Sequence, residues 1–160
     1  MFNKLTMALL AAWAGLSIAL PAAFAEEFTG TVVGVSDGDT ITVLRDGVPR
    51  KIRLSGIDCP EKAQAFGQQA KQFTAERSFS KQVKVIASGH DRYRRTIGEV
   101  ILPDGQNLND LLLANGFAWW YQRYSHDEQR HELEDNARRH KLGLWHDAQP
   151  DAPWDYRKFH

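Results

Sequence analysis

Hydrophobic and polar residues alternate in three short segments near the start of the chain, residues 28–35, 40–45 and 50–55. An alternation of period two places every second side chain on one face, which is typical of half-buried β-strands. Asp46 and Gly47 lie between the second and third segments, and this dipeptide favours a two-residue hairpin turn. The pattern therefore predicts three consecutive strands, of which the last two form a hairpin.

The period of the hydrophobic positions then changes. Apolar residues recur three or four positions apart in residues 64–80, and this spacing predicts a helix. Residues 83–88 and 96–102 return to strand-like patterns, and the Pro-Asp-Gly triplet at 103–105 indicates a turn. The middle of the chain is therefore expected to contain one helix and two more strands.

Two further helices are predicted from their end signals. Asn107 can cap a short Leu-rich helix that stops at Gly116. After an aromatic stretch, Ser125 and Glu128 have the spacing of a capping box. We expect this box to start a last helix that ends before Gly143.

The order of these elements suits an α+β fold, a five-stranded OB-fold β-barrel with three α-helices. Periodicity alone does not separate this barrel from other α+β sandwiches. The C-terminal residues 147–160 contain proline and tryptophan. We expect them to lie along the surface with Trp154 packed against the domain.

Residues 1–25 have the composition of a segment that is removed. Lys4 precedes an apolar stretch, and the small residues Ala23 and Ala25 stand at its end. This is the pattern of a secretory signal peptide, whereas a membrane anchor would need a longer apolar run. We predict cleavage after Ala25 and one domain over residues 26–160. The product should be exported, periplasmic or secreted, without membrane contact, and monomeric by default.

Charge and cysteine content restrict the possibilities further. The chain has 20 basic and 20 acidic residues, so removal of Lys4 with the signal leaves a net charge of −1 with neutral histidines. A protein that coats nucleic acid by charge alone would be far more basic. The basic residues gather locally, above all in residues 91–95. Cys59 is the single cysteine, which excludes an internal disulfide.

Three aspartates lie at the ends of the predicted strands. Asp37 and Asp39 flank Gly38 just before the second strand, and Asp58 follows the third. Asp-Gly is a common turn signal, so the first pair has a plain structural explanation. The hairpin nevertheless brings Asp39 and Asp58 to one edge, where like charges repel unless a proton or cation lies between them. Oxygen ligands favour a hard cation, Ca²⁺ or Mg²⁺.

Basic and acidic side chains beside these aspartates suit a phosphodiester substrate. Arg53 leads into Asp58, and Arg95 ends the basic run before the fifth strand. Guanidinium groups bind paired phosphate oxygens and stabilise charge that develops on phosphorus. A cation can polarise the phosphoryl oxygen, and Glu61 can orient or deprotonate a water molecule.

Four segments stand out in this order along the chain: SDGDT at 36–40, RLSGIDCPE at 53–61, DRYRR at 91–95 and LLLANGFAWWY at 111–121. As an ordered set they resemble the thermonuclease family of secreted staphylococcal-nuclease-like enzymes. The ending GLWHDAQPDAPWDYRK is similar to the tails of family members from Gram-negative bacteria. The resemblance implies an OB-fold barrel with three helices. It also implies Ca²⁺-dependent cleavage of DNA and RNA to 3′-phosphate and 5′-hydroxyl ends.

The same resemblance implies roles for individual residues. Asp39 and Asp58 correspond to the calcium-ligating aspartates, the backbone carbonyl of Cys59 to a third ligand, and Asp37 to an acid that reaches the metal through water. The positions that match the catalytic residues are Arg53, Glu61 and Arg95.

Aromatic residues after Gly116 are expected to contact the substrate. At the two base-stacking positions of the family, Tyr124 matches and Gln122 does not. Either Tyr121 replaces the missing ring or the affinity for nucleotides is lower. Aromatic rings offer stacking platforms that tolerate any base. Trp119 and Trp120 are expected to serve mainly in packing.

Two other functions remain open at this point. The first is a non-catalytic OB-fold module that binds single-stranded nucleic acid. The second is a domain that calcium merely stabilises, in which the arginines are incidental. A nucleophilic role for Cys59 is disfavoured because no histidine or positive neighbour that could activate the thiol is adjacent in sequence.

Overall fold

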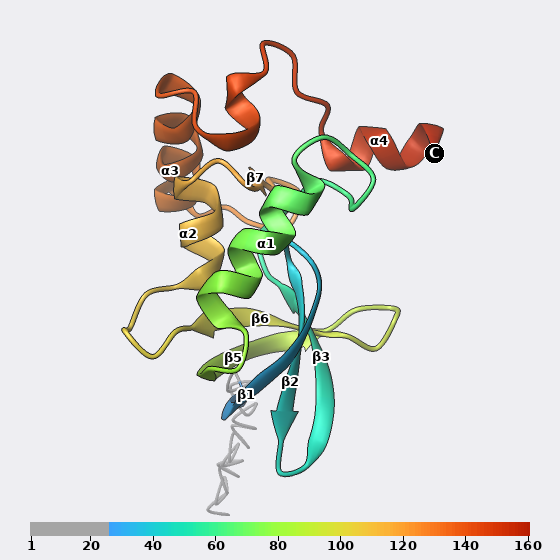
Figure 1. Ribbon diagram of the computed structural model, residues 1–160, viewed down its shortest axis with the longest axis vertical. Coiled ribbons are helices and arrows are strands. Elements are labelled where there is room, and N and C mark those ends of the chain that lie inside the picture. Colours follow the sequence, from blue (N-terminus) through green and yellow to red (C-terminus); the bar gives the residue numbers. More distant parts are fainter. Residues whose placement is uncertain (1–25) are drawn as a thin grey trace, which may run out of the picture.

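The computed structural model describes residues 26–160; the predicted signal peptide lies outside the described residues. Five strands close into a barrel in the order β1-β2-β3-β6-β5 (Figure 1). Their bounds are Glu26–Asp37 for β1, Thr40–Arg45 for β2, Val48–Leu54 for β3, Gln82–His90 for β5 and Thr96–Ile101 for β6. A short pair outside the barrel joins β4 (Ile57–Asp58) to β7 (Trp119–Trp120). The predicted five-stranded OB-fold barrel is confirmed.

The hairpin between β2 and β3 forms as the turn chemistry predicts. Asp46 and Gly47 both have positive φ, 50° and 76°, which is the conformation of a type I′ turn. Antiparallel pairing then sets Thr40 opposite Arg53 at the far end of the hairpin. The acidic turn before β2 and the segment after β3 therefore lie at the same rim of the barrel.

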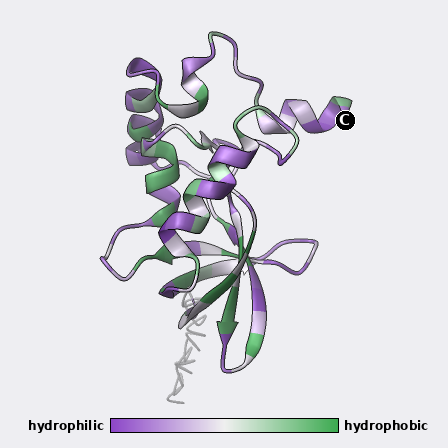
Figure 2. Cartoon of the chain, in the orientation of Figure 1, coloured by the Kyte–Doolittle hydropathy of each residue, from purple (hydrophilic) through white to green (hydrophobic). Residues whose placement is uncertain are grey.

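Side chains that face the barrel axis form the main core. Val32, Ile41 and Ile52 are fully shielded from solvent, and so are Leu108 and Leu112 of a covering helix. Figure 2 shows hydrophobic and hydrophilic colours mixed along the barrel strands, as expected for strands with one face in the core. The strictly alternating burial of β6 reflects a strand with one face in the core and one face outward.

Four α-helices accompany the barrel, one more than predicted. They are α1 (Gly67–Ser78), α2 (Leu108–Ala114), α3 (Glu128–Arg139) and α4 (Pro153–Phe159), with a 3-10 turn, η1, at Gly143–His146. Figure 1 shows α1 beside the barrel strands, α2 and α3 next to it, and α4 at the opposite side near the C-terminus. No helix within residues 26–160 has the length and apolar character needed to cross a bilayer.

Two predicted helix starts need correction. The helix predicted from residue 64 begins at Gly67, because Phe66 has a φ of 65°, a left-handed conformation that an α-helix cannot contain. The last helix is capped by Asp127, whose side chain accepts a hydrogen bond from the Gln129 amide, rather than by Ser125 in a capping box. The Asn107 cap is confirmed, since its side chain accepts from the Asn109 amide.

The polar helix α3 is held in place by buried ion pairs. Arg130 contacts Glu99 of β6 at 2.6 Å and Asp110 of α2 at 2.8 Å, although its side chain is almost fully buried. Glu134 accepts a hydrogen bond from the Trp120 amide at 3.0 Å, which ties α3 to β7. Charged side chains therefore help to anchor α3 to its neighbours, whereas buried leucines anchor α2.

Candidate active site at the barrel rim

The rim where β2 begins and β3 ends carries the predicted acidic cluster. Asp39 and Asp58 are 6% and 1% exposed, so both carboxylates are removed from water. The backbone carbonyl of Asp39 accepts a hydrogen bond from the Leu54 amide at 2.9 Å, which locks the acidic turn to the end of β3. The predicted convergence of Asp39 and Asp58 is therefore present.

Arg53 joins these two carboxylates. Its Nη1 lies 3.1 Å from Oδ2 of Asp39, and its Nη2 donates to Oδ1 of Asp58 at 2.9 Å. Nη1 also donates to the backbone carbonyls of Leu54 and Ile57. Three of the five guanidinium N–H groups thus donate to protein acceptors among the described residues, which leaves two for another ligand.

The acidic turn is rigid because α1 packs against it. The side chain of Thr74 donates to the carbonyl of Gly38. A Cβ atom at Gly38 would lie 2.8 Å from Cβ of Ala70 and 2.9 Å from Sγ of Cys59, so any larger residue would push the turn away from the helix. The glycine between the two aspartates is therefore required by the close approach of α1 and Cys59.

Asp37 belongs to this cluster, and its negative charge is not fully compensated by neighbouring groups. Its Oδ1 is buried and has no hydrogen-bond partner among the described residues. Burial, reinforced by the nearby charge of Asp39, raises the pKa of Asp37 to about 6. A buried, unpartnered carboxylate oxygen next to two further carboxylates attracts a cation.

Cys59 contributes its backbone to the site. Its amide donates to Oδ2 of Asp39 at 2.7 Å. The thiol is buried, and burial, followed by the charge of Asp39, raises its pKa well above the usual range. A thiol in such surroundings stays protonated, so the structure agrees with the prediction that Cys59 is not a nucleophile.

Glu61 follows β4 and reaches the same cluster through a residue that the sequence did not single out. Nη1 of Arg157, in α4, lies 2.6 Å from Oε1 of Glu61, and Nη2 of Arg157 lies 2.7 Å from Oδ2 of Asp58. Burial raises the pKa of Asp58, while the hydrogen bond from Arg157 and the charge of Arg53 lower it. Glu61 and Asp58 are thereby bridged by one guanidinium.

Arg95 lies in the turn that immediately precedes β6, the strand next to β3. The parallel pairing of β3 with β6 sets Arg53 opposite Ile97, two residues after Arg95. Asp91 accepts hydrogen bonds from the amide and from Nε of Arg95, the latter at 2.7 Å. Asp91 thus stabilises the turn before β6 and also holds the Arg95 guanidinium.

The aromatic residues after β7 lie next to β4. The Tyr121 amide donates to the Gly56 carbonyl at 3.0 Å, which extends the β4–β7 pairing towards the site. The Tyr121 ring stacks on Trp154 of α4, with centroids 5.2 Å apart, whereas Tyr124 is 70% exposed. Tyr121 also lines an open groove of about 400 Å³ with Arg123 and other residues. Tyr124 is therefore free to contact a ligand, and one face of Tyr121 is covered.

Trp119 and Trp120 behave as expected. Trp120 is buried and stacks on His131 of α3. Trp119 packs edge-on against Trp145 of η1 and Trp154 of α4. These rings hold the C-terminal elements to the barrel.

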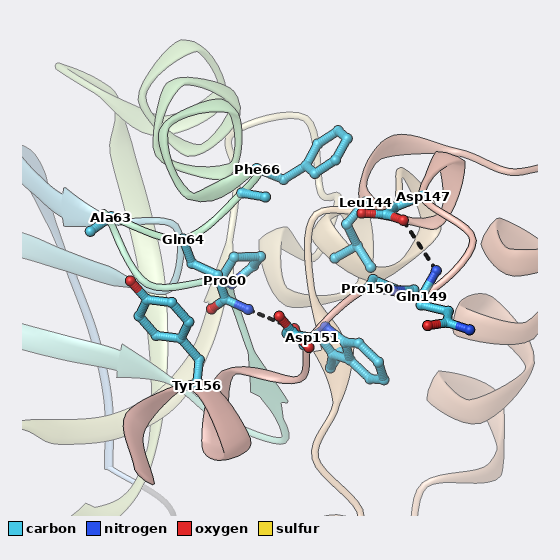
Figure 3. Close-up of a pocket in the computed structure, with 12 residues that line it drawn as sticks. Pro60, Ala63, Gln64, Phe66, Leu144, Asp147, Gln149, Pro150, Asp151 and Tyr156 are labelled. Atoms are coloured by element: carbon cyan, nitrogen blue, oxygen red, sulfur yellow. Dashed lines mark hydrogen bonds between the residues drawn. The ribbon is translucent and has the colours of Figure 1, made fainter. Parts of the chain in front are cut away.

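A smaller pocket of about 140 Å³ separates the tail from the segment after Cys59 (Figure 3). Pro60 and Gln64 line one side, and Asp151 and Tyr156 line the other. The Gln64 side chain donates to the Asp151 carbonyl at 2.6 Å across this gap. The tail is thus attached directly beside Glu61.

Comparison with known proteins agrees with this arrangement. A family model described as "Staphylococcal nuclease homologue" matches residues 51–147. The chain belongs to the staphylococcal nuclease family. It is 42% identical over 142 residues to "Micrococcal nuclease" of Shigella flexneri, which covers 82% of each chain. It is 41% identical over 140 residues to "Uncharacterized endonuclease" of Haemophilus influenzae, which covers 87% of this chain and 78% of the relative.

Membership of the staphylococcal nuclease family supports a nuclease function for this chain. The match also covers Arg53, Asp58, Glu61 and Arg95. It does not extend to α4, which begins at Pro153. The helix that carries Arg157 is therefore outside the matched part of the family fold.

The donor set at the rim fits a hard cation. Within residues 26–160, no three His, Cys, Asp or Glu side chains gather tightly enough to form a metal site by themselves. In the predicted site, only the carboxylates of Asp39 and Asp58 bind the cation directly. A backbone carbonyl and water molecules complete its coordination. The unpartnered Oδ1 of Asp37 supplies a further oxygen beside them.

Arg157 was not predicted as a site residue, although the sequence contains a signal for its helix. Pro153 is favoured at the first turn of a helix. Trp154 and Arg157 are three residues apart, so a helix places them on neighbouring positions of one face. Their contacts with Tyr121 and Asp58 could not be read from that spacing, because Asp58 is 99 residues away.

Proposed function

We propose that this protein is a Ca²⁺-dependent nuclease that hydrolyses phosphodiester bonds of DNA and RNA to 3′-phosphate and 5′-hydroxyl ends. The observation that carries the proposal is the convergence of two buried carboxylates, Asp39 and Asp58, joined by Arg53 at the barrel rim. Family membership supplies the class of reaction, and the donor set supports the choice of a hard cation.

The cation would be held by Asp39, Asp58 and the backbone carbonyl of Cys59, with Asp37 contributing through water. When bound, it would polarise a phosphoryl oxygen and offset negative charge as phosphorus becomes five-coordinate. The buried acids favour this because each carboxylate gains a counter-charge that water cannot supply at that depth.

The side chains around the cation site would activate the water molecule and bind the phosphate. Glu61 would orient a water molecule and accept its proton as the water attacks phosphorus. Arg53 has two N–H groups left for a phosphate oxygen, and Arg95 lies just before β6, the strand that pairs with the end of β3. Both guanidinium groups would bind the phosphate and stabilise its charge in the transition state.

The substrate would be held beyond the phosphate by aromatic stacking. Tyr124 is exposed and meets Tyr121 edge-on at 5.0 Å, so the two rings can support a base together. Arg123 lies in the adjoining groove and can neutralise a further phosphate. Stacking of this kind favours no particular base, in agreement with a nuclease of broad specificity.

A digestion assay tests this function. Plasmid DNA and RNA are incubated with the protein in Ca²⁺ and, separately, in EDTA. We expect cleavage in Ca²⁺ only, and a decrease of about 10²–10⁴-fold for Glu61→Gln. Glu76→Gln, an exposed carboxylate on α1, is the matched control and should cut as the wild type does.

The alternatives give different results in the same assay. Binding of single-stranded nucleic acid without cleavage would favour the non-catalytic OB-fold module. A rise in thermal stability with Ca²⁺, without binding or cleavage, would favour the structural calcium domain. Full activity of Glu61→Gln would remove Glu61 from the mechanism.

We also propose that the protein is exported and cleaved after Ala25, as the pattern of residues 1–25 indicates. Expression of the full chain in a Gram-negative host followed by N-terminal sequencing of the periplasmic and extracellular fractions tests this. A mature chain that starts at Glu26 is the expected result. Retention of residues 1–25 in the product would contradict it.

A further inference from the structure

The C-terminal helix α4 is anchored beside the acidic cluster at three points. Trp154 stacks nearly parallel on Tyr121, with an angle of 6° between the rings. It also meets Trp119 edge-on at 5.5 Å. The preceding segment is fixed by the hydrogen bond from Gln64 to the Asp151 carbonyl. These contacts place the next turn of α4, which contains Arg157, directly over Asp58 and Glu61.

Arg157 uses this position to bind the two acids. Its Nη2 lies 2.7 Å from Oδ2 of Asp58, its Nη1 lies 3.3 Å from Oδ1 of Asp58, and the same Nη1 lies 2.6 Å from Oε1 of Glu61. The neighbouring Lys158 pairs within α4 with Asp155 instead. Arg157 is thus the residue of α4 that is directed at the site.

Both oxygens of Asp58 are already in use. Oδ1 accepts from Arg53 and Oδ2 accepts from Arg157. Three hydrogen bonds from guanidinium groups already occupy most of the lone-pair sites of this carboxylate. A divalent cation at Asp58 would compete for these oxygens and repel the nearby positive charges, so its binding favours the withdrawal of one guanidinium.

The structure indicates which arginine withdraws. The Arg53 side chain is 16% exposed and also donates to two backbone carbonyls, whereas the Arg157 side chain is 42% exposed and contacts carboxylates only. Arg53 lies within a barrel strand, but Arg157 lies on a terminal helix of seven residues. Breaking the contacts of Arg157 should therefore cost less free energy than breaking those of Arg53.

We propose that Arg157 is a positioning residue of the cation site. Its guanidinium holds Asp58 and Glu61 in place when no cation is bound, and a divalent cation must displace it from Asp58. This inference rests on the proposed function, because the cation is the one assigned to Asp39 and Asp58 above. The guanidinium of Arg157 therefore lowers the affinity of the site for its cation.

Calorimetric titration of the metal-free mature protein with Ca²⁺ tests the proposal. We expect Arg157→Gln to bind Ca²⁺ about tenfold more tightly than the wild type, since no guanidinium competes for Asp58. Lys158→Gln removes the same charge from the next position of α4 and is the matched control; its dissociation constant should equal that of the wild type. Arg157→Lys, which cannot bridge both acids with a planar fork, should lie in between.

The outcomes are separable from those of the nuclease assay. Equal or weaker Ca²⁺ binding by Arg157→Gln, with DNA cleavage preserved, would overturn the inference and leave the nuclease function standing. A purely structural role would lower the melting temperature of Arg157→Gln without a change in Ca²⁺ affinity. If neither protein binds Ca²⁺ or cleaves DNA, the proposed function falls and the inference falls with it. Should Arg157→Gln not fold, the Arg157→Lys titration decides.

Discussion

Replacement of Asp37 by Asn should stabilise the protein at neutral pH when no cation is present. The folded protein raises the pKa of Asp37 from 3.8 to about 6, chiefly through burial and the charge of Asp39. At about 1.4 kcal/mol per pKa unit this shift corresponds to roughly 3 kcal/mol. Because the side chain is partly exposed, solvent screening reduces our expectation to about 1–2 kcal/mol.

The sign of the pH dependence follows from linkage. A carboxyl group with a raised pKa binds its proton more tightly in the folded chain than in the unfolded chain. The stability of the wild type should therefore fall as pH rises from about 4 to 6, and the full penalty should be present above pH 6. An asparagine does not titrate, so Asp37→Asn lacks this part of the pH dependence.

Urea unfolding in EDTA measures the effect. The gain in unfolding free energy of Asp37→Asn over the wild type should be about 1–2 kcal/mol larger at pH 8 than at pH 4.5. Glu27→Gln, an exposed carboxylate on the same strand, is the control and should show no such difference. If the gain of Asp37→Asn were the same at both pH values, the burial of an ionised Asp37 would be refuted. With saturating Ca²⁺ the gain should shrink, because a bound cation compensates the wild-type charge.

Three further changes have defined outcomes. Arg130→Met should lower the unfolding free energy by roughly 3 kcal/mol in urea titrations, because it leaves Glu99 and Asp110 without their buried partner; an unchanged midpoint would contradict the role of this pair. Gly38→Ala should lower the free energy of unfolding by about 1–3 kcal/mol, because the added Cβ crowds Cys59. Gly34→Ala, whose added Cβ would meet its neighbours at ordinary contact distances, is the control in the same thermal melts. Addition of Ca²⁺ to the EDTA-treated protein should raise the melting temperature, and no shift at millimolar Ca²⁺ would argue against a cation at the rim.

The contacts of Arg53 and Arg157 also explain how carboxylates can lie close together at the rim. Three carboxylates meet at a dry rim, and two guanidinium groups neutralise most of their charge. Asp37 is the acid left without this compensation, and it is the one with an unpartnered oxygen. The cation site is thus kept assembled by side chains that the cation would partly replace.

Much of the fold was accessible from local sequence signals. The hairpin turn at Asp46, the cap at Asn107 and the strand at 40–45 depend on neighbours within a few residues, and all three are confirmed. The start of the first long helix was predicted three residues early, because apolar spacing does not report the left-handed conformation of Phe66. The start of the last helix was misassigned to Ser125 because two capping side chains competed nearby.

Local signals in the sequence were enough to predict the individual strands, the hairpin and the carboxylates at its ends, since turn chemistry and period-two patterning act over short distances. The parallel pairing of β3 with β6 that closes the barrel was not among these predictions. Convergence of Asp39 and Asp58 followed from the hairpin register alone. Only the tertiary structure decided that Arg53 joins these two acids, that Asp91 holds Arg95, and that Arg157 reaches Asp58. These contacts depend on how α4 and the loops pack against the closed barrel. No local sequence pattern determines which residues, far apart in the chain, meet there.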